Sequence, residues 1–186
     1  MRNIINYNYK IKNGSARPVD YLILGIIYTT LKNYPDALSN LNEALRLDPR
    51  FTIGYMARGY ARYCDAIGQM KINASQQENA NIFEDKIYSG LMQEAIEDFN
   101  KALQLNPRLV FAWFNIGNIF LECNDLKSAL QCFDRAIELD PGFGEAYFNR
   151  GLTYLESGNR QNAFEDLSKA GELGILPSYN ILKRMK

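Results

Sequence analysis

The side chains that most often carry out acid–base catalysis and metal binding are scarce in this sequence. It contains no histidine among its 186 residues, so the commonest general base and the commonest metal ligand are both absent. The three cysteines, Cys64, Cys123 and Cys132, show no Cys-x-x-Cys spacing. They are therefore expected to be free thiols in a reducing compartment rather than a metal or redox site. The sequence predicts no metal and no cofactor.

Carboxylate pairs such as Glu165 and Asp166 are present, but we expect them on the outer, solvated faces of helices. No nucleophile–base pair and no phosphate-binding loop can be drawn from the sequence. The sequence thus predicts that the protein is not an enzyme. An enzyme would show a closed polar pocket with shifted pKa values, whereas a binding scaffold would show an open apolar groove.

The charge balance argues against nucleic acid as a partner. Lys and Arg together number 21, as do Asp and Glu, and no basic run is longer than Lys183 and Arg184. A nucleic-acid-binding surface needs a basic surplus to displace counterions from phosphate groups. The apolar fraction of 47% is that of a folded domain.

Small residues recur along the chain at a constant spacing. Gly117 and Gly151 are 34 residues apart, and an alanine follows each of them after twelve residues. A second alanine follows seven residues later in each case. The same scaffold begins at Gly25 and at Gly59. Its alanines are Ala37, Ala44, Ala95, Ala102, Ala129, Ala136, Ala163 and Ala170.

This period resembles that of the tetratricopeptide repeat (TPR) family, whose units carry an aromatic residue, a glycine, spaced alanines and a closing proline. The aromatic residues here are Tyr21, Tyr55, Trp113 and Tyr147, and the prolines are Pro49, Pro107 and Pro141. The resemblance implies an all-α, right-handed TPR-type α-solenoid of four helix–turn–helix units plus a C-terminal capping helix. The expected units are 18–51, 52–109, 110–143 and 144–177, with the capping helix at 178–186.

The repeat has a physical explanation. Glycine and alanine let two helices approach closely, and proline ends a helix because it cannot continue a helix interior. Neighbouring units must stack to cover each other's apolar faces. Arg58 and Arg150 depart from the family pattern, which has an aliphatic residue before the glycine. We expect their stems to pack while their charged heads reach water.

One apolar segment, 21–28, follows several basic residues as the core of a signal peptide or anchor would. It is too short to span a bilayer, and no small-residue cleavage site follows it. The repeat register explains its apolarity instead. We therefore expect no membrane insertion and, given the free cysteines, a cytoplasmic protein.

The second unit carries an insertion of 24 residues between Gly59 and Ala95. Phe83, Ile87, Leu91, Ala95 and Phe99 fall every four residues, which predicts a second helix from about Asn81 to Leu105. With a first helix continuing past Gly68, the result would be a protruding helical hairpin. It is either a tolerated surface insertion or a docking surface for a partner or a second copy, through Phe83, Ile87 and Tyr88.

The first residues show a different pattern. Ile5, Tyr7, Tyr9 and Ile11 alternate with polar residues, as in a β-strand. We expect residues 1–17 to be an extended segment, because an isolated strand is not stable in water. It would be disordered or would lie in a groove of this molecule or of a neighbour.

In TPR proteins, the first helices of successive units line a concave face that holds ligands. The resemblance therefore implies a protein–protein interaction adaptor that binds a protein or peptide partner in an apolar, aromatic groove. Self-assembly into a homo-oligomer, through this groove or the hairpin, is the alternative. The expected binding residues are Met56, Tyr60, Tyr63, Phe111, Phe114, Asn115, Asn118, Leu121, Phe148, Asn149, Leu152 and Leu155, with Leu22, Ile26 and Thr29 from the first unit. The carboxylate clamp of one TPR subgroup is expected to be absent, because its lysines are missing here.

Overall fold

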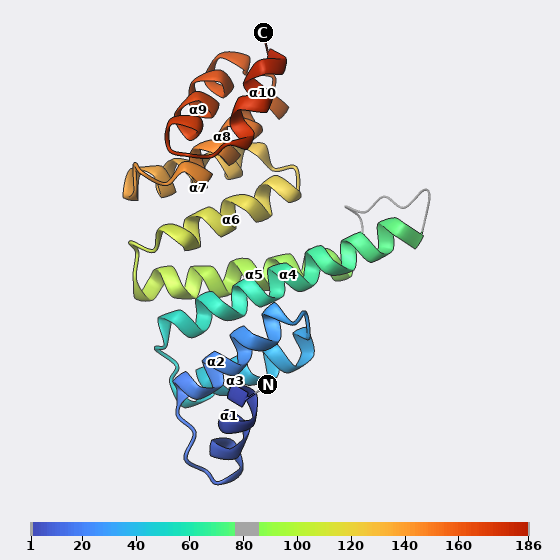
Figure 1. Cartoon of the computed structure of the whole chain (residues 1–186), viewed down its shortest axis with the longest axis vertical. Helices are drawn as coiled ribbons and strands as arrows, with labels where there is room; N and C mark the ends of the chain where they lie inside the picture. The colour runs from blue at the N-terminus through green and yellow to red at the C-terminus, as the bar shows by residue number, and fades with distance from the viewer. Residues whose placement is uncertain (1, 77–85, 186) are drawn as a thin grey trace. The chain divides into compact units, whose positions relative to one another are not determined.

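The structure is a computed structural model that describes residues 2–76 and 86–185. Within these residues it has ten α-helices and no strand (Figure 1). The all-α class is therefore confirmed. The helices are α1 (Arg2–Lys12), α2 (Pro18–Thr30), α3 (Tyr34–Leu47), α4 (Thr52–Gln76), α5 (Lys86–Leu105), α6 (Val110–Glu122), α7 (Leu126–Leu139), α8 (Gly144–Glu156), α9 (Arg160–Glu172) and α10 (Pro177–Met185).

The chain forms two compact units, residues 1–107 and 108–186. In the first unit, α2 packs against α3, α4 packs against α5, and α3 and α4 join the two pairs. In the second unit, α6 with α7 and α8 with α9 form the equivalent pairs, which α7 and α8 join. The first helices of the pairs also touch: α2 contacts α4, and α6 contacts α8. The boundaries of the four expected repeats stay predictions.

The turns inside three of the helix pairs have the same construction. The last residue before each second helix caps it, because its side-chain oxygen accepts a hydrogen bond from a backbone N–H of the first helical turn. These caps are Asn33, Asp125 and Asn159. The residue before each cap has a positive φ: Lys32 (58°), Asn124 (58°) and Gly158 (80°).

The paired helices approach each other where the glycines of the repeat lie. A Cβ atom added at Gly117 would lie 2.7 Å from Cε1 of Phe133, whose side chain is fully buried. The alanines that follow each glycine are also fully buried, for example Ala129 and Ala136. The core of each unit is thus built from small residues on facing helices, with single large side chains between them.

The expected extended N-terminal segment is wrong, because residues 2–12 form α1. Ile4, Tyr7 and Ile11 are spaced as on one face of a helix, and these three residues are half-buried. Ile5 and Tyr9, which belonged to the alternating pattern that suggested a strand, are exposed. α1 contacts α2. The Nζ atom of Lys10 donates a hydrogen bond of 2.6 Å to Oδ1 of the buried Asp20.

The insertion in the second repeat lengthens α4. This helix continues past Gly68 to Gln76, as expected, and α5 ends at Leu105, as expected. The expected helix start near Asn81 and residue Phe83 lie outside the described residues. Ile87 and Tyr88 lie in α5, but their side chains are not described. None of the helices in the described part is both long and apolar enough to cross a membrane.

The expected capping helix is present as α10, which packs against α9. It begins at Pro177, whose fixed φ suits the first turn of a helix. Ser178 is fully buried and its hydroxyl donates a 2.7 Å hydrogen bond to the carbonyl of Ile175. α10 thereby covers a face of α9. No further helix pair follows in the described residues to cover this face.

Candidate functional site

The expected binding residues of the first unit lie on α4. Met56, Tyr60 and Tyr63 are all partly exposed, and Tyr60 keeps 49% of its surface accessible. A hydrogen bond with Cys64 raises the pKa of the Tyr60 hydroxyl. Leu22, in contrast, is buried.

Leu22 packs in a cluster with Ala37, Leu41 and Ala61. It belongs to the core and does not line a binding face, because its position on α2 points toward α3 and α4. Ile26, one turn further along α2, is exposed as expected.

In the second unit, the expected binding residues come from two neighbouring helices, α6 and α8. None of them is buried. They are Phe111, Phe114, Asn115, Asn118 and Leu121 on α6, and Phe148, Asn149, Leu152 and Leu155 on α8. We call this set the α6–α8 face.

Two asparagines join the helices of the α6–α8 face. Nδ2 of Asn149 donates a 2.7 Å hydrogen bond to Oδ1 of Asn118. In the described part of the chain, the Asn118 amide nitrogen and the Asn149 amide oxygen form no further hydrogen bond, so both a donor and an acceptor stay available. Asn115 instead donates to the carbonyl of Phe111 on its own helix, at 2.7 Å.

An aromatic cluster divides the phenylalanines of the α6–α8 face into two kinds. The ring of Phe114 lies 5.9 Å from that of Phe133 and 4.8 Å from that of Phe143, so it supports the core. Phe111 also contacts Phe143, at 5.3 Å, but 63% of its surface is exposed. Sequence reasoning missed Phe143. The signal that could have found it is a repeated phenylalanine: Phe51 directly precedes α4, as Phe143 directly precedes α8.

The half-buried Arg58 and Arg150 differ from expectation, because their charged heads form ion pairs. Arg58 on α4 holds Asp98 of α5 in a two-pronged ion pair, with N–O distances of 2.9 and 2.6 Å. Its third nitrogen donates to Asn42 of α3 at 2.7 Å. Arg62 adds a further contact to Asp98 at 2.5 Å. The side chain of Asp98 is only 3% exposed.

The same arrangement recurs in the second unit. Arg150 on α8 binds both carboxylate oxygens of Asp166 at 2.7 Å and donates to Asp134 of α7 at 2.6 Å. Burial opposes the charge of Arg150, but the hydrogen bonds to Asp166 and Asp134 outweigh it and raise the pKa of Arg150. The expectation that Asp166 is solvated is wrong, because it is buried.

These ion pairs alternate along the chain. The residues before the four repeat glycines are Leu24, Arg58, Ile116 and Arg150, and the residues three places after the first alanines are Asn40, Asp98, Cys132 and Asp166. The second and fourth repeats thus carry the ion pair. The third has apolar residues at both positions. Burial raises the pKa of Cys132 to about 11, so its thiol stays protonated at neutral pH.

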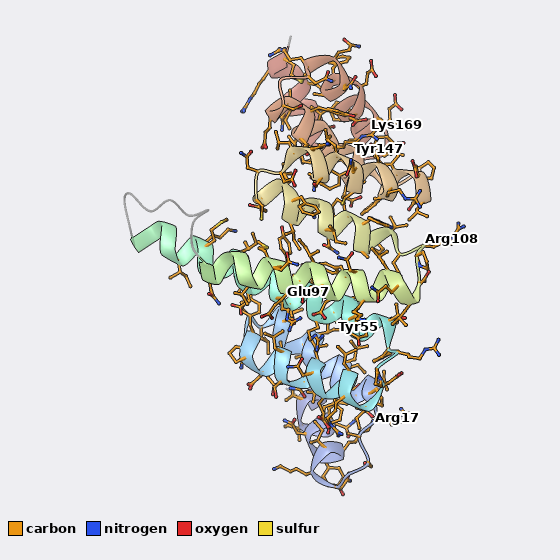
Figure 2. The ribbon with its side chains drawn as sticks, turned by 180° about the vertical axis from the view of Figure 1, so that it is seen from behind. Arg17, Tyr55, Glu97, Arg108, Tyr147 and Lys169 are labelled. Carbon is orange, nitrogen blue, oxygen red and sulfur yellow. The ribbon has the colours of Figure 1, made fainter. Side chains whose placement is uncertain are left out.

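The first unit also has a polar cavity of about 610 Å³ around the Arg58–Asp98 pair. Tyr55 of α4 and Glu97 of α5, both labelled in Figure 2, line it. Its central charges are already neutralised by one another. Among the described residues, no group of three or more Cys, Asp or Glu side chains is placed to hold a metal ion.

Paired helices with a recurrent close-packing glycine and a partly exposed two-helix face define a helical repeat protein. Two family models match the sequence, one of the TPR repeat over residues 117–158 and one of the tetratricopeptide repeat over 21–51, 87–109 and 144–173. Together they match more than half of the chain. The protein belongs to the tetratricopeptide repeat family, in which protein–protein interaction is the typical function and members typically act as non-catalytic scaffolds.

Solved structures of TPR proteins share the fold. MamA is 22% identical, with a TM-score of 0.71 over 93% of this chain and 87% of that one. A thermophilic TPR protein, TTC0263 from Thermus thermophilus, is 19% identical, with a TM-score of 0.73 over 96% of this chain and 86% of that one. PilF of Pseudomonas aeruginosa is 23% identical, with a TM-score of 0.63 over 84% and 61%. A search of curated protein sequences finds no match.

Proposed function

We propose that the protein is an adaptor that binds an extended segment of a partner protein on the α6–α8 face. The observation that carries the proposal is the large exposed ring of Phe111, which lies on the same face as the asparagine pair that joins α6 and α8. An exposed aromatic anchor beside unsatisfied amide groups fits a peptide, which offers both side chains and backbone hydrogen bonds.

The two asparagines have a specific role in this proposal. The free amide N–H of Asn118 donates to a backbone carbonyl of the ligand, and the free amide oxygen of Asn149 accepts from a backbone N–H. Such contacts bind an extended peptide largely regardless of its sequence. Phe111 and Phe148 then select apolar side chains.

A selection of peptides from a displayed random library, against the full-length protein, tests the proposal. A selected peptide should bind the double variant Phe111→Ala with Phe148→Ala at least about 30-fold more weakly, because central aromatic anchors contribute about 2 kcal/mol or more. The matched control is Phe164→Ala with Leu176→Ala, two exposed apolar residues outside the face. Equal loss in both double variants, measured by titration calorimetry, would contradict the proposed site.

Self-assembly is the competing function of the same face. Light scattering at increasing protein concentration separates the two. A constant monomer mass supports an adaptor for a different protein. A mass that doubles with concentration in the wild type, but not in the Phe111→Ala/Phe148→Ala variant, would assign the face to a second copy of the chain.

A further inference from the structure

α4 continues well past the point at which the other first helices end. α2, α6 and α8 each end five residues after the repeat glycine, at Thr30, Glu122 and Glu156. α4 runs to Gln76, seventeen residues after Gly59. The extension gives the first unit a surface that the other repeats lack.

A cavity of about 620 Å³ lies between this extension and the turn that joins α2 to α3. Its volume falls within the usual range of ligand pockets, about 300–1,000 Å³. The residues that define its walls and rim are Lys32, Tyr34, Tyr63, Ile67, Lys71 and Ile72. Four of these side chains are apolar or aromatic, and the other two are lysines.

The absence of a side chain at Gly68 shapes the floor of the cavity. A Cβ atom there would lie 3.6 Å from Cε2 of Tyr34, so the tyrosine ring lies directly against the helix. Burial raises the pKa of Tyr34, which keeps its hydroxyl protonated as a donor. In the described part of the chain this hydroxyl forms no hydrogen bond.

The rim of the cavity is positively charged. Lys32 and Lys71 are exposed and form no ion pair with any described residue. Asp65 is the single carboxylate among the described lining residues, and its Oδ1 already accepts a 2.9 Å hydrogen bond from Gln69. A cavity whose described lining carries one carboxylate and two ammonium groups that pair with no described side chain attracts an anionic partner.

The backbone at Lys32 supports a role for this side chain. Its φ of 58° is a left-handed conformation, which disfavours a residue with a Cβ atom by about 1 kcal/mol. The equivalent turns use Asn124 and Gly158, the residue types that tolerate this conformation best. A lysine in a disfavoured backbone conformation at the mouth of a cavity supports the hypothesis that its charge has a function there.

We propose that this cavity is a second binding site, which takes a short segment of a partner protein with an aromatic side chain flanked by carboxylates. The aromatic ring enters between Tyr34 and Tyr63 and accepts the offset or edge-to-face contacts that aromatic pairs prefer. The flanking carboxylates reach Lys32 and Lys71. This site is independent of the α6–α8 face, because every residue in it belongs to the first unit.

The test uses the full-length protein and a fluorescein-labelled, acetylated and amidated pentapeptide, Glu-Asp-Phe-Glu-Asp. Fluorescence anisotropy should show saturable binding that weakens as salt is added, because exposed ion pairs are screened. Two comparison peptides separate the contributions. Gln-Asn-Phe-Gln-Asn lacks the charge and Glu-Asp-Ala-Glu-Asp lacks the ring, and each should bind at least about tenfold more weakly.

Two variants locate the site. Lys32→Asn with Lys71→Gln removes both charges, while asparagine preserves the left-handed turn as it does at position 124. Binding should weaken about fivefold or more and lose its salt dependence. Gly68→Leu fills the cavity without changing a charge and favours the helix, so it should abolish binding without loss of helicity, as circular dichroism would show.

The matched control is Lys127→Gln with Lys183→Gln, which removes two exposed lysines from the second unit and should bind as the wild type does. Equal weakening in this control, or unchanged binding by Gly68→Leu, would overturn the proposal. Binding that appears only after Phe83, Glu84 and Asp85 are replaced by alanine would assign the cavity to the chain's own segment and would equally overturn it. The Phe111→Ala/Phe148→Ala variant should bind this probe normally, which separates the two sites.

Discussion

Arg150 illustrates how strongly one half-buried residue can control the stability of a repeat. Replacing it with isoleucine should lower the free energy of unfolding of the second unit by about 3 kcal/mol, because Asp166 would remain buried without its partner. The arginine side chain is 18% exposed and that of Asp166 is 9% exposed, so water can do little to compensate. Urea denaturation followed by circular dichroism measures the loss.

The double variant Arg150→Ile with Asp166→Cys is the control for this prediction. It installs the pair that the third repeat already uses, Ile116 and Cys132. Most of the lost stability should return, because no charge is left buried and unpaired. If the double variant is as unstable as the single one, the ion pair is not the cause of the loss.

At the residue scale, the sequence predicted which positions matter better than it predicted their partners. Arg58 and Arg150 were identified as departures from the repeat pattern. Their partners were not, because Asp98 is 40 residues from Arg58 and on the far side of the insertion. Only folding brings these charges together, and a snorkelling arginine and a paired one look the same in a sequence.

At the scale of single elements, the close approach of helices can be tested at a glycine. Gly117→Ala should destabilise the second unit by about 1–3 kcal/mol, because the new Cβ would lie 2.7 Å from the buried ring of Phe133 and overpacking strains a core. Gly90→Ala on α5 is the matched control. Nothing lies within 4 Å of a Cβ there, so it should stabilise α5 by about 1 kcal/mol. Thermal unfolding distinguishes the two signs.

The docking of α1 on α2 should depend on pH. The hydrogen bond from Lys10 lowers the pKa of Asp20, while burial opposes this and the Arg17 backbone supports it. A lowered pKa stabilises the fold above the ordinary value of 3.8 and the contribution is lost as the pH falls through the lowered value. Lys10→Met should therefore weaken the protection of α1 amides from hydrogen exchange at neutral pH.

The same comparison at acidic pH provides the control for the Lys10 variant. Below the lowered pKa, Asp20 is neutral in both proteins, so the difference in exchange between the wild type and the variant should shrink. A difference that persists unchanged into acid would mean that Lys10 supports α1 through its stem and its contact with Tyr7, and not through the carboxylate.

The elements themselves followed from the sequence to different degrees. Most of the spacing and helix ends from α2 to α9 are explained by the repeated glycines, alanines and prolines. The end of α4 at Gln76 and the start of α5 at Lys86 lie in the insertion and do not follow from the repeat. α1 lies outside this pattern, and its apolar residues satisfy two periodicities at once. Ile5, Tyr7, Tyr9 and Ile11 suggested a strand, but Ile4, Tyr7 and Ile11 on one helical face can pack on α2, which decides the conformation.

At the scale of the whole molecule, each compact unit should fold by itself. Residues 108–186 contain two helix pairs and the capping helix α10, which together cover the apolar face of α9. Expressed alone, this fragment should be helical and unfold cooperatively in urea.

Removing residues 177–186 from the same fragment gives the sharper comparison. Tyr179 packs so closely on Gly171 that a Cβ at position 171 would lie 2.9 Å from the tyrosine ring. Without α10, this face of α9 is exposed, so the shortened fragment should unfold at lower urea and bind a hydrophobic dye. Identical denaturation curves for the two fragments would show that α10 does not act as a cap.

The cavity beside α4 was beyond the reach of the sequence for a physical reason. Lys32 and Tyr34 belong to the first repeat, whereas Gly68 and Lys71 belong to the insertion in the second. No spacing rule connects them. The residues of the α6–α8 face other than Phe111, in contrast, recur at the same offsets from the repeat glycine in both helices, so pattern reasoning could find them.

The alternation of apolar and ionic repeats has a consequence for protein engineering. A designer who averaged the four repeats column by column would choose the residue before the glycine and the residue that faces it independently. Some of the resulting arrays would place aspartate opposite isoleucine and bury a charge without a counterion. Arg58 and Arg150 also bind Asn42 and Asp134, which belong to the preceding repeat. The module to copy from this chain is therefore two consecutive repeats, and concatenating such tandem modules keeps every arginine next to both of its acceptors.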